Sequence, residues 1–213
     1  MYHTLRYQIC IALAPALLSL PVHAAKAPKA GTTVQLAVLE TTDLHANVVG
    51  YDYYKLAAEP SHGLDRTATL IHQARKEFPN TFLLDNGDTI QGNALADYQA
   101  LVKPLACDQT LGIYKVMNAL KYDGAGIGNH EFNYGLAFLN QVTGSRFRVE
   151  GVGQPKRCAG PAFPVVLANV YSAKTKKPLF SPYAIIDKQV SAVGADAALA
   201  VQRRAGTLPA AAR

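Results

Sequence analysis

The sequence has few charged residues and no run of lysine and arginine interleaved with aromatic residues. Of 213 residues, 17% are charged and 49% are hydrophobic. This balance excludes a generally disordered chain and is sufficient for a packed core. The formal net charge of +6 suits anionic ligands, but without a basic and aromatic surface stretch we expect no nucleic-acid partner.

The sequence also lacks an apolar run long enough to cross a membrane, which takes about 20 residues. Its longest candidate, residues 9–22, follows Arg6 and runs into Val22-His23-Ala24, where small residues occupy the positions that a signal peptidase reads. Residues 1–24 are therefore interpreted as a cleaved secretory signal, and residues 25–33 as a flexible lead-in. We expect a periplasmic protein with no stable membrane association after cleavage.

Cysteine is scarce. Of three cysteines, Cys10 lies in the expected signal, which leaves Cys107 and Cys158. An even pair in an oxidising compartment can form a disulfide. Two separate thiols are the alternative at this stage.

Strand-like and helix-like apolar segments alternate along residues 34–190, and this order predicts an α/β fold. Expected strands cover residues 34–40, 81–84, 124–127 and 164–170, and expected helices cover residues 64–78, 111–120 and 134–142.

Residues 191–213 differ in composition, because they contain no aromatic residue and their apolar content is mostly alanine. Alanine buries little area, so this Ala/Arg-rich tail adds little to a core. Propensity alone favours a weak helix over residues 195–204. A shifted reading frame and a natural tail both explain such a composition.

Three short polar motifs follow predicted strands, where α/β folds place their sites. Asp43 and His45 are two residues apart, so an extended segment would point both side chains the same way. Asp88 follows Gly87, which allows a sharp turn. Asn129 and His130 follow Gly128. Taken singly, these are also the patterns of a turn cap, an Asn-Gly-Asp turn and a buried histidine.

Taken in order, Asp-x-His, Gly-Asp-x-x-Gln-Gly and Gly-Asn-His-Glu resemble the motifs of the calcineurin-like metallophosphoesterases. The segments TTDLHANVVGYDYYK, LLDNGDTIQGNALADY and GIGNHEFNYGLAFL are similar to those of the bacterial 2',3'-cyclic-nucleotide 2'-phosphodiesterase/3'-nucleotidases of the 5'-nucleotidase family. Asn133 favours that branch, since 5'-nucleotidases proper usually have aspartate there.

The resemblance implies a layered β-sandwich flanked by helices, incomplete here on its C-terminal side. It implies two divalent metal ions (Mn, Zn, Mg or Co), nucleotide substrates, and metal-dependent hydrolysis of phosphate esters. Asp43 and His45 would hold the first metal, Asp88 would bridge both metals, and Asn129 would hold the second. The catalytic residue would be His130, acting on the transferring phosphoryl group.

The family pattern also includes further histidine ligands, yet this sequence has no histidine after His130. We therefore expect at most partial metal occupancy and little turnover from this chain. The alternatives are a catalytically silent truncated fragment with residual metal binding, and a 5'-nucleotidase. The motifs identify no substrate-binding residue.

Overall fold

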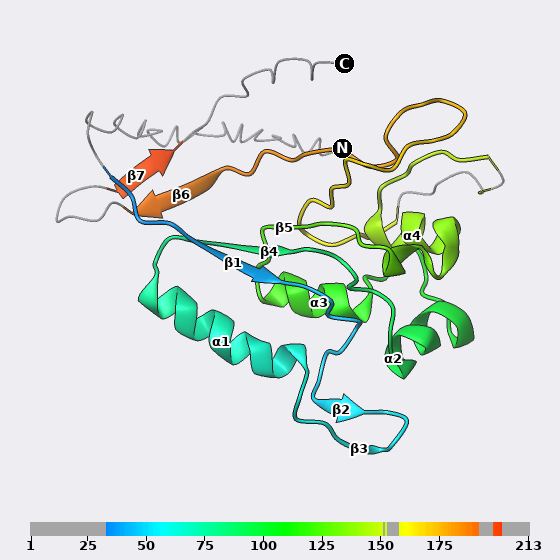
Figure 1. Cartoon of the computed structure of the whole chain (residues 1–213), viewed down its shortest axis with the longest axis horizontal. Helices are drawn as coiled ribbons and strands as arrows, with labels where there is room; N and C mark the ends of the chain where they lie inside the picture. The colour runs from blue at the N-terminus through cyan, green and yellow to red at the C-terminus, as the bar shows by residue number, and fades with distance from the viewer. Residues whose placement is uncertain (1–32, 151, 153–157, 192–197, 202–213) are drawn as a thin grey trace, which may run out of the picture.

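The computed structural model describes residues 33–150, 152, 158–191 and 198–201. Its centre is a three-stranded parallel sheet in the order β1 (Ala37–Thr41), β4 (Thr81–Asp85) and β5 (Gly124–Ala125), as Figure 1 shows. β1 pairs with β4 from Ala37 opposite Thr81 to Thr41 opposite Asp85. Both strands therefore end level with one another, and their following loops start at the same edge.

Two helices lie on one face of this sheet. α1 (Leu64–Glu77) connects β1 to β4, and α3 (Gly112–Ala119) connects β4 to β5. Both crossovers step in the same direction across the sheet, so right-handed connections place both helices on the same side (Figure 1). The core between them includes fully buried side chains from both layers: Leu64, Leu83, Ile113, Tyr114 and Met117.

Shorter elements surround the sheet's carboxyl edge. α2 (Ala94–Asp97) starts at Asn93, whose side chain accepts a hydrogen bond from the Ala96 amide, and it continues into a π-helix, η1 (Tyr98–Val102). A 3₁₀ turn, η2 (His130–Phe132), leads to α4 (Gly135–Thr143). β2 (Tyr51–Asp52) and β3 (Ala57–Ala58) form a small hairpin.

A disulfide joins Cys107 to Cys158, with a Cα–Cα distance of 4.5 Å. The Ala159 amide also donates to the Cys107 carbonyl oxygen at 2.7 Å. The segment after η1 is thereby tied to the segment after α4.

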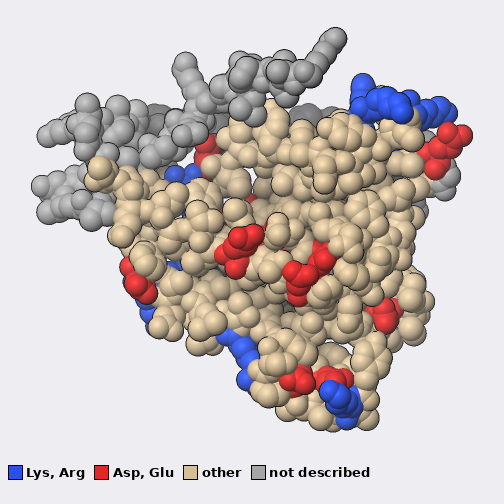
Figure 2. All heavy atoms as spheres, in the orientation of Figure 1, with Lys and Arg blue, Asp and Glu red and all other residues tan. Residues whose placement is uncertain are grey.

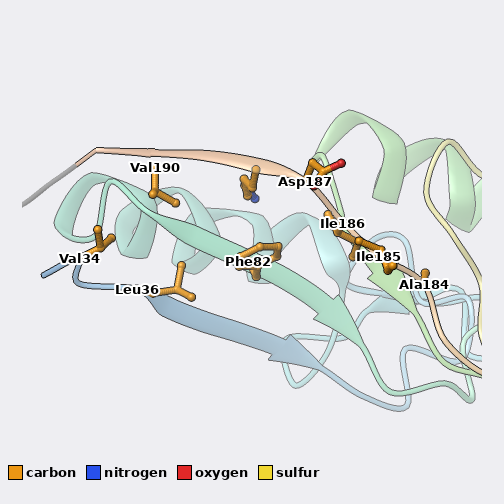
Figure 3. A pocket seen from close by; sticks show the side chains of 9 residues that line it. Val34, Leu36, Phe82, Ala184, Ile185, Ile186, Asp187 and Val190 are labelled. Atoms are coloured by element: carbon orange, nitrogen blue, oxygen red, sulfur yellow. The ribbon is translucent and has the colours of Figure 1, made fainter. Parts of the chain in front are cut away.

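The other face of the sheet carries apolar side chains that are only partly covered. Leu36 and Val38 are 47% and 61% exposed. The segment 184–190 partly encloses a cavity of about 530 Å³ lined by Leu36, Phe82, Ile186 and Val190 (Figure 3). Lys188 anchors that segment, because its Nζ lies 2.6 Å from Asp123 Oδ2 and 4.8 Å from the centre of the Phe82 ring.

Two predicted elements differ from the structure. Residues 164–170 were expected to form a strand, but only Val165 bridges to Ala125, because the backbone amide of Leu167 bonds Ser181 instead. A weak helix was expected over residues 195–204. Instead, β7 (Ala198–Val201) pairs antiparallel with β6 (Lys188–Ser191), so strand pairing overrides alanine's helix propensity here.

The expected α/β class is confirmed, with a parallel sheet and helices on one face. Within the described residues, the second sheet of a sandwich is not present; the remaining strands form the two hairpins β2–β3 and β6–β7. The expected signal, residues 1–24, lies outside the described residues. No helix in the described part of the chain is both long enough and apolar enough to cross a membrane.

Candidate metal centre

The three motifs meet at the carboxyl edge of the sheet, in the loops after β1, β4 and β5. Backbone hydrogen bonds hold the first two loops side by side: the amides of Asp43, His45 and Ala46 donate to the carbonyls of residues 87, 88 and 89 at 3.1, 2.9 and 2.7 Å. The position of the first motif is therefore fixed by the backbone of the second.

Asp43, His45 and Asp88 each direct one donor atom toward a common point, and these atoms lie within 4.8 Å of one another. His45 Nε2 is 3.6 Å from Asp43 Oδ1. Carboxylate oxygens and an imidazole nitrogen are suitable donors for a divalent cation. The donor set and its convergence therefore fit a divalent metal ion.

The route by which Asp43 and His45 converge differs from the prediction. They do not lie on an extended segment: their φ angles are 54° and 45°, and Ala46 follows at 55°. Asp88 also has a positive φ, 56°. Non-glycine residues adopt this left-handed region at an energetic cost and are concentrated at functional sites. A left-handed turn, rather than strand alternation, brings the donors together.

The ring of His45 is held in one orientation. Its Nδ1 lies 2.7 Å from the Gln91 carbonyl oxygen, which can only accept, so Nδ1 carries the proton. Nε2 is then the ring nitrogen on the side of Asp43, and in the neutral ring it is the one that offers a lone pair to a metal. Backbone carbonyls fix histidine metal ligands in this way.

Glycine allows the loops to pack this closely. A Cβ at Gly92 would lie 2.6 Å from the Cβ of His45, and a Cβ at Gly128 would lie 2.7 Å from the Asp88 amide nitrogen. Side chains at either position would displace a candidate ligand.

His130 borders the cluster. Its backbone N–H donates to Asp88 Oδ1 at 2.8 Å, and its ring centroid is 5.1 Å from that of His45. Its Nδ1 lies 3.0 Å from Gln91 Oε1 and 2.9 Å from Asn133 Nδ2. Asn129, which directly precedes His130, is exposed, and its role as a ligand stays a prediction.

Sequence reasoning assigned no role to Gln91, although it contacts both histidines, His45 through its carbonyl and His130 through its side chain. The sequence signal that could have identified it was its place in the Gly-Asp-x-x-Gln-Gly motif, between Asp88 and Gly92.

A buried carboxylate, Asp85, lies directly behind the cluster and is 3% exposed. It accepts hydrogen bonds from Thr41 Oγ1 at 2.6 Å, Thr89 Oγ1 at 2.5 Å and the Gly87 amide at 3.0 Å. Burial raises the pKa of the Asp85 carboxyl above its usual value, against the effect of these hydrogen bonds. Asp85 therefore braces the loop that presents Asp88.

Known proteins with similar sequences are nucleotide phosphoesterases. A "2',3'-cyclic-nucleotide 2'-phosphodiesterase/3'-nucleotidase" from Yersinia enterocolitica is 45% identical over 182 residues, 85% of this chain and 25% of the relative. A protein of the same name from Salmonella typhimurium is 46% identical over 164 residues, 77% of this chain and 23% of the relative. No protein-family model matches the chain.

The fold is shared as well. The crystal structure of the calcineurin-like phosphoesterase YfkN from Bacillus subtilis matches 72% of this chain with a TM-score of 0.62 at 41% identity. The chain belongs to the calcineurin-like phosphoesterases. It spans about a quarter of the length of the two bacterial relatives and 42% of the solved YfkN chain.

Membership of the calcineurin-like phosphoesterases agrees with the place and chemistry of the cluster. Figure 2 shows acidic side chains near the middle of the face in view, and basic side chains at its upper right corner and toward its lower edge. The exposed lysines Lys174, Lys176 and Lys177 belong to one turn, in which the Lys176 amide donates to the Ser172 carbonyl at 2.8 Å.

Proposed function

We propose that this chain contributes to a metal-dependent phosphoesterase that hydrolyses 2',3'-cyclic nucleotides to 3'-nucleotides and then releases phosphate from 3'-nucleotides. The observation that carries the proposal is the convergence of Asp43, His45 and Asp88 donor atoms within 4.8 Å at the carboxyl edge of the sheet. The names of the two bacterial relatives support the substrate class.

Divalent ions held by these residues would supply neutralisation of the phosphate charge, a lowered pKa for a bound water and stabilisation of both oxygens of an in-line displacement. Asp43 and His45 would hold the first ion, Asp88 would bridge, and Asn129 would hold the second. Mn, Zn, Mg and Co are each compatible with these donors.

His130 is the residue best placed to act on the substrate. Its Nδ1 is within hydrogen-bond distance of both Gln91 Oε1 and Asn133 Nδ2 and bonds one of them, so Nε2 is the nitrogen left to face a bound phosphate. There it would stabilise charge on the phosphoryl group and deliver a proton to the leaving oxygen.

We expect low turnover from the 213-residue chain, because three convergent side chains and Asn129 are fewer ligands than a filled two-metal centre takes. Binding of a divalent ion without catalysis is the alternative for this chain. A preference for 5'-nucleotides is the alternative for the substrate.

The test is Mn²⁺ titration of the purified chain, followed by hydrolysis assays with 2',3'-cyclic AMP, 3'-AMP and 5'-AMP. We expect Mn²⁺ binding that is lost in Asp88→Asn, and slow hydrolysis with 2',3'-cyclic AMP preferred over 5'-AMP. Faster hydrolysis of 5'-AMP would favour a 5'-nucleotidase. No Mn²⁺ binding, or equal binding by Asp88→Asn, would refute the proposed site.

We also propose that the protein is exported to the periplasm. The pattern of residues 1–24 carries this proposal, and the Cys107–Cys158 disulfide supports it, since disulfides persist in oxidising compartments. Mass spectrometry of the protein from a periplasmic extract should find Ala25 at its N-terminus. An intact Met1 in a cytoplasmic extract would contradict the proposal.

A further inference from the structure

Glu131 is almost completely buried, with 1% of its surface exposed, directly beside the candidate metal centre. None of the ion pairs found among the described residues includes it. A buried carboxylate without a cationic partner is costly unless hydrogen-bond donors surround it. The hydrogen bonds of the Glu131 carboxylate therefore have to offset the cost of burying it.

Four backbone amides donate to the Glu131 carboxylate. Oε1 accepts from Thr89 at 2.5 Å and from Ile90 at 3.2 Å. Oε2 accepts from Asp88 at 2.9 Å and from Gly128 at 2.7 Å. One side chain thus fills its acceptor sites with donors from two loops, the loop after β4 and the loop after β5.

These two loops carry candidate ligands and the candidate catalytic histidine. Oε2 joins the amide of Asp88 itself to the amide of the residue before Asn129. The Asp88 carboxylate in turn accepts the His130 amide at 2.8 Å. The loop after β1 depends on the same network, because the His45 amide donates to the Asp88 carbonyl.

We propose that Glu131 is a positioning residue for the metal centre: it fixes the three ligand-bearing loops in register without itself binding metal or substrate. The proposal rests on the proposed function, because it takes Asp43, His45 and Asp88 as the metal ligands. Its four acceptor bonds hold Asp88 in its left-handed conformation, at φ 56°, and so set the direction of its carboxylate.

The test replaces Glu131 by glutamine, which keeps the shape of the side chain. Either orientation of the amide places an NH₂ group against two backbone N–H groups, so at least one amide of residues 88–90 loses its acceptor. Asp123→Asn is the matched control. Asp123 is a partly buried carboxylate that, like Glu131, accepts a backbone amide, from Leu83 at 2.8 Å, but its other partner is Lys188 and not an amide of the three loops.

Two measurements on the full chain distinguish positioning from general stability. Mn²⁺ affinity, measured by electron paramagnetic resonance at a temperature where circular dichroism shows all variants folded, should fall at least about 10-fold in Glu131→Gln. It should stay within about twofold of the parent in Asp123→Asn, because that residue touches no ligand loop. Equal losses in both variants, or no loss in Glu131→Gln, would overturn the proposal.

Amide hydrogen exchange provides the second arm and needs no metal. In the parent chain, the amides of Asp88, Thr89 and Gly128 should be protected, and Glu131→Gln should accelerate exchange within residues 88–90. Rapid exchange in the parent would refute the proposal even if Glu131→Gln does not fold. Failure of the parent to bind Mn²⁺ would instead refute the proposed metal site and leave the exchange result to decide the role of Glu131.

Discussion

Replacing Gly92 with alanine should displace the His45 imidazole and weaken binding of a divalent metal. A Cβ at this position would lie 2.6 Å from His45 Cβ, 2.7 Å from Nδ1 and 2.8 Å from Cγ. All three distances are far inside van der Waals contact. The ring cannot turn away freely, since its Nδ1 is bonded to the carbonyl of Gln91, the residue before the substitution.

Two costs add in this variant. Overpacking against His45 costs about 1–3 kcal/mol. Alanine at φ +142° adds about 1–3 kcal/mol of backbone strain. We therefore expect the free energy of unfolding to fall by about 2–6 kcal/mol. Moving a ligand ring off its hydrogen-bonded orientation should weaken Mn²⁺ affinity by at least about 10-fold.

Gly135→Ala is the matched control, because Gly135 also has a positive φ, +82°, but a Cβ there meets no atom within 4 Å. It should show only the strain cost of about 1–3 kcal/mol and unchanged Mn²⁺ affinity. Urea unfolding measures the stability, and electron paramagnetic resonance measures the binding. Near-parental Mn²⁺ affinity in Gly92→Ala, or an equal loss in Gly135→Ala, would refute the reasoning.

Three further predictions concern pH dependence, the disulfide and self-association. Because the pKa of the Asp85 carboxyl is raised, the native state binds more protons than the unfolded state at pH values just above the ordinary aspartate pKa, so the free energy of unfolding of the parent should fall as pH rises through this window, and that of Asp85→Asn should not. Urea melts whose midpoints change with pH in the same way for parent and variant, from about pH 4 to about pH 7, would contradict this. Reducing the Cys107–Cys158 bridge, which spans 51 residues, should lower the free energy of unfolding by about 4 kcal/mol; an unchanged urea midpoint would contradict this. Val38→Lys on the open sheet face should reduce self-association in sedimentation and binding of a hydrophobic dye; unchanged values would show that this face is covered.

Helices with strong apolar periodicity were predicted closely. Residues 64–78 and 111–120 were expected as helices, and α1 and α3 occupy Leu64–Glu77 and Gly112–Ala119. The first strand was placed too early, at residues 34–40, because its apolar composition starts before its pairing. The partner strand begins at Thr81, opposite Ala37, and register with that partner decides where β1 begins.

Elements stabilised by local capping rather than periodicity were missed. α2 has four residues, too few for a periodic signal, and only its Asn93 cap marked it in the sequence. The hairpin β2–β3 has two residues in each strand. Its pairing depends on tertiary contacts that composition does not reveal.

The residue types and order of the candidate site were visible in the sequence, since Asp43, His45 and Asp88 stood in recognisable motifs. The left-handed backbone that brings them together was not, because aspartate and histidine adopt φ values above zero more often than most residues but still only in a minority of cases. Nor did the sequence distinguish a carboxylate that faces the metal cluster from one that is buried. Asp85 and Asp88 are three residues apart, yet one braces the loop and the other faces the cluster.

The placement of acidic groups has a thermodynamic consequence for the loops. Asp43 and Asp88 contribute donor atoms to the candidate metal centre, while Asp85 and Glu131 are buried, and burial together with the nearby Glu131 carboxylate raises the pKa of Asp85. Backbone amides and threonine hydroxyls satisfy the buried pair. Among the ion pairs of the described residues, these two outer carboxylates take part only in the one between Asp43 and His45. A bound cation would therefore offset repulsion across all three loops, so that metal binding and ordering of the loops should be coupled.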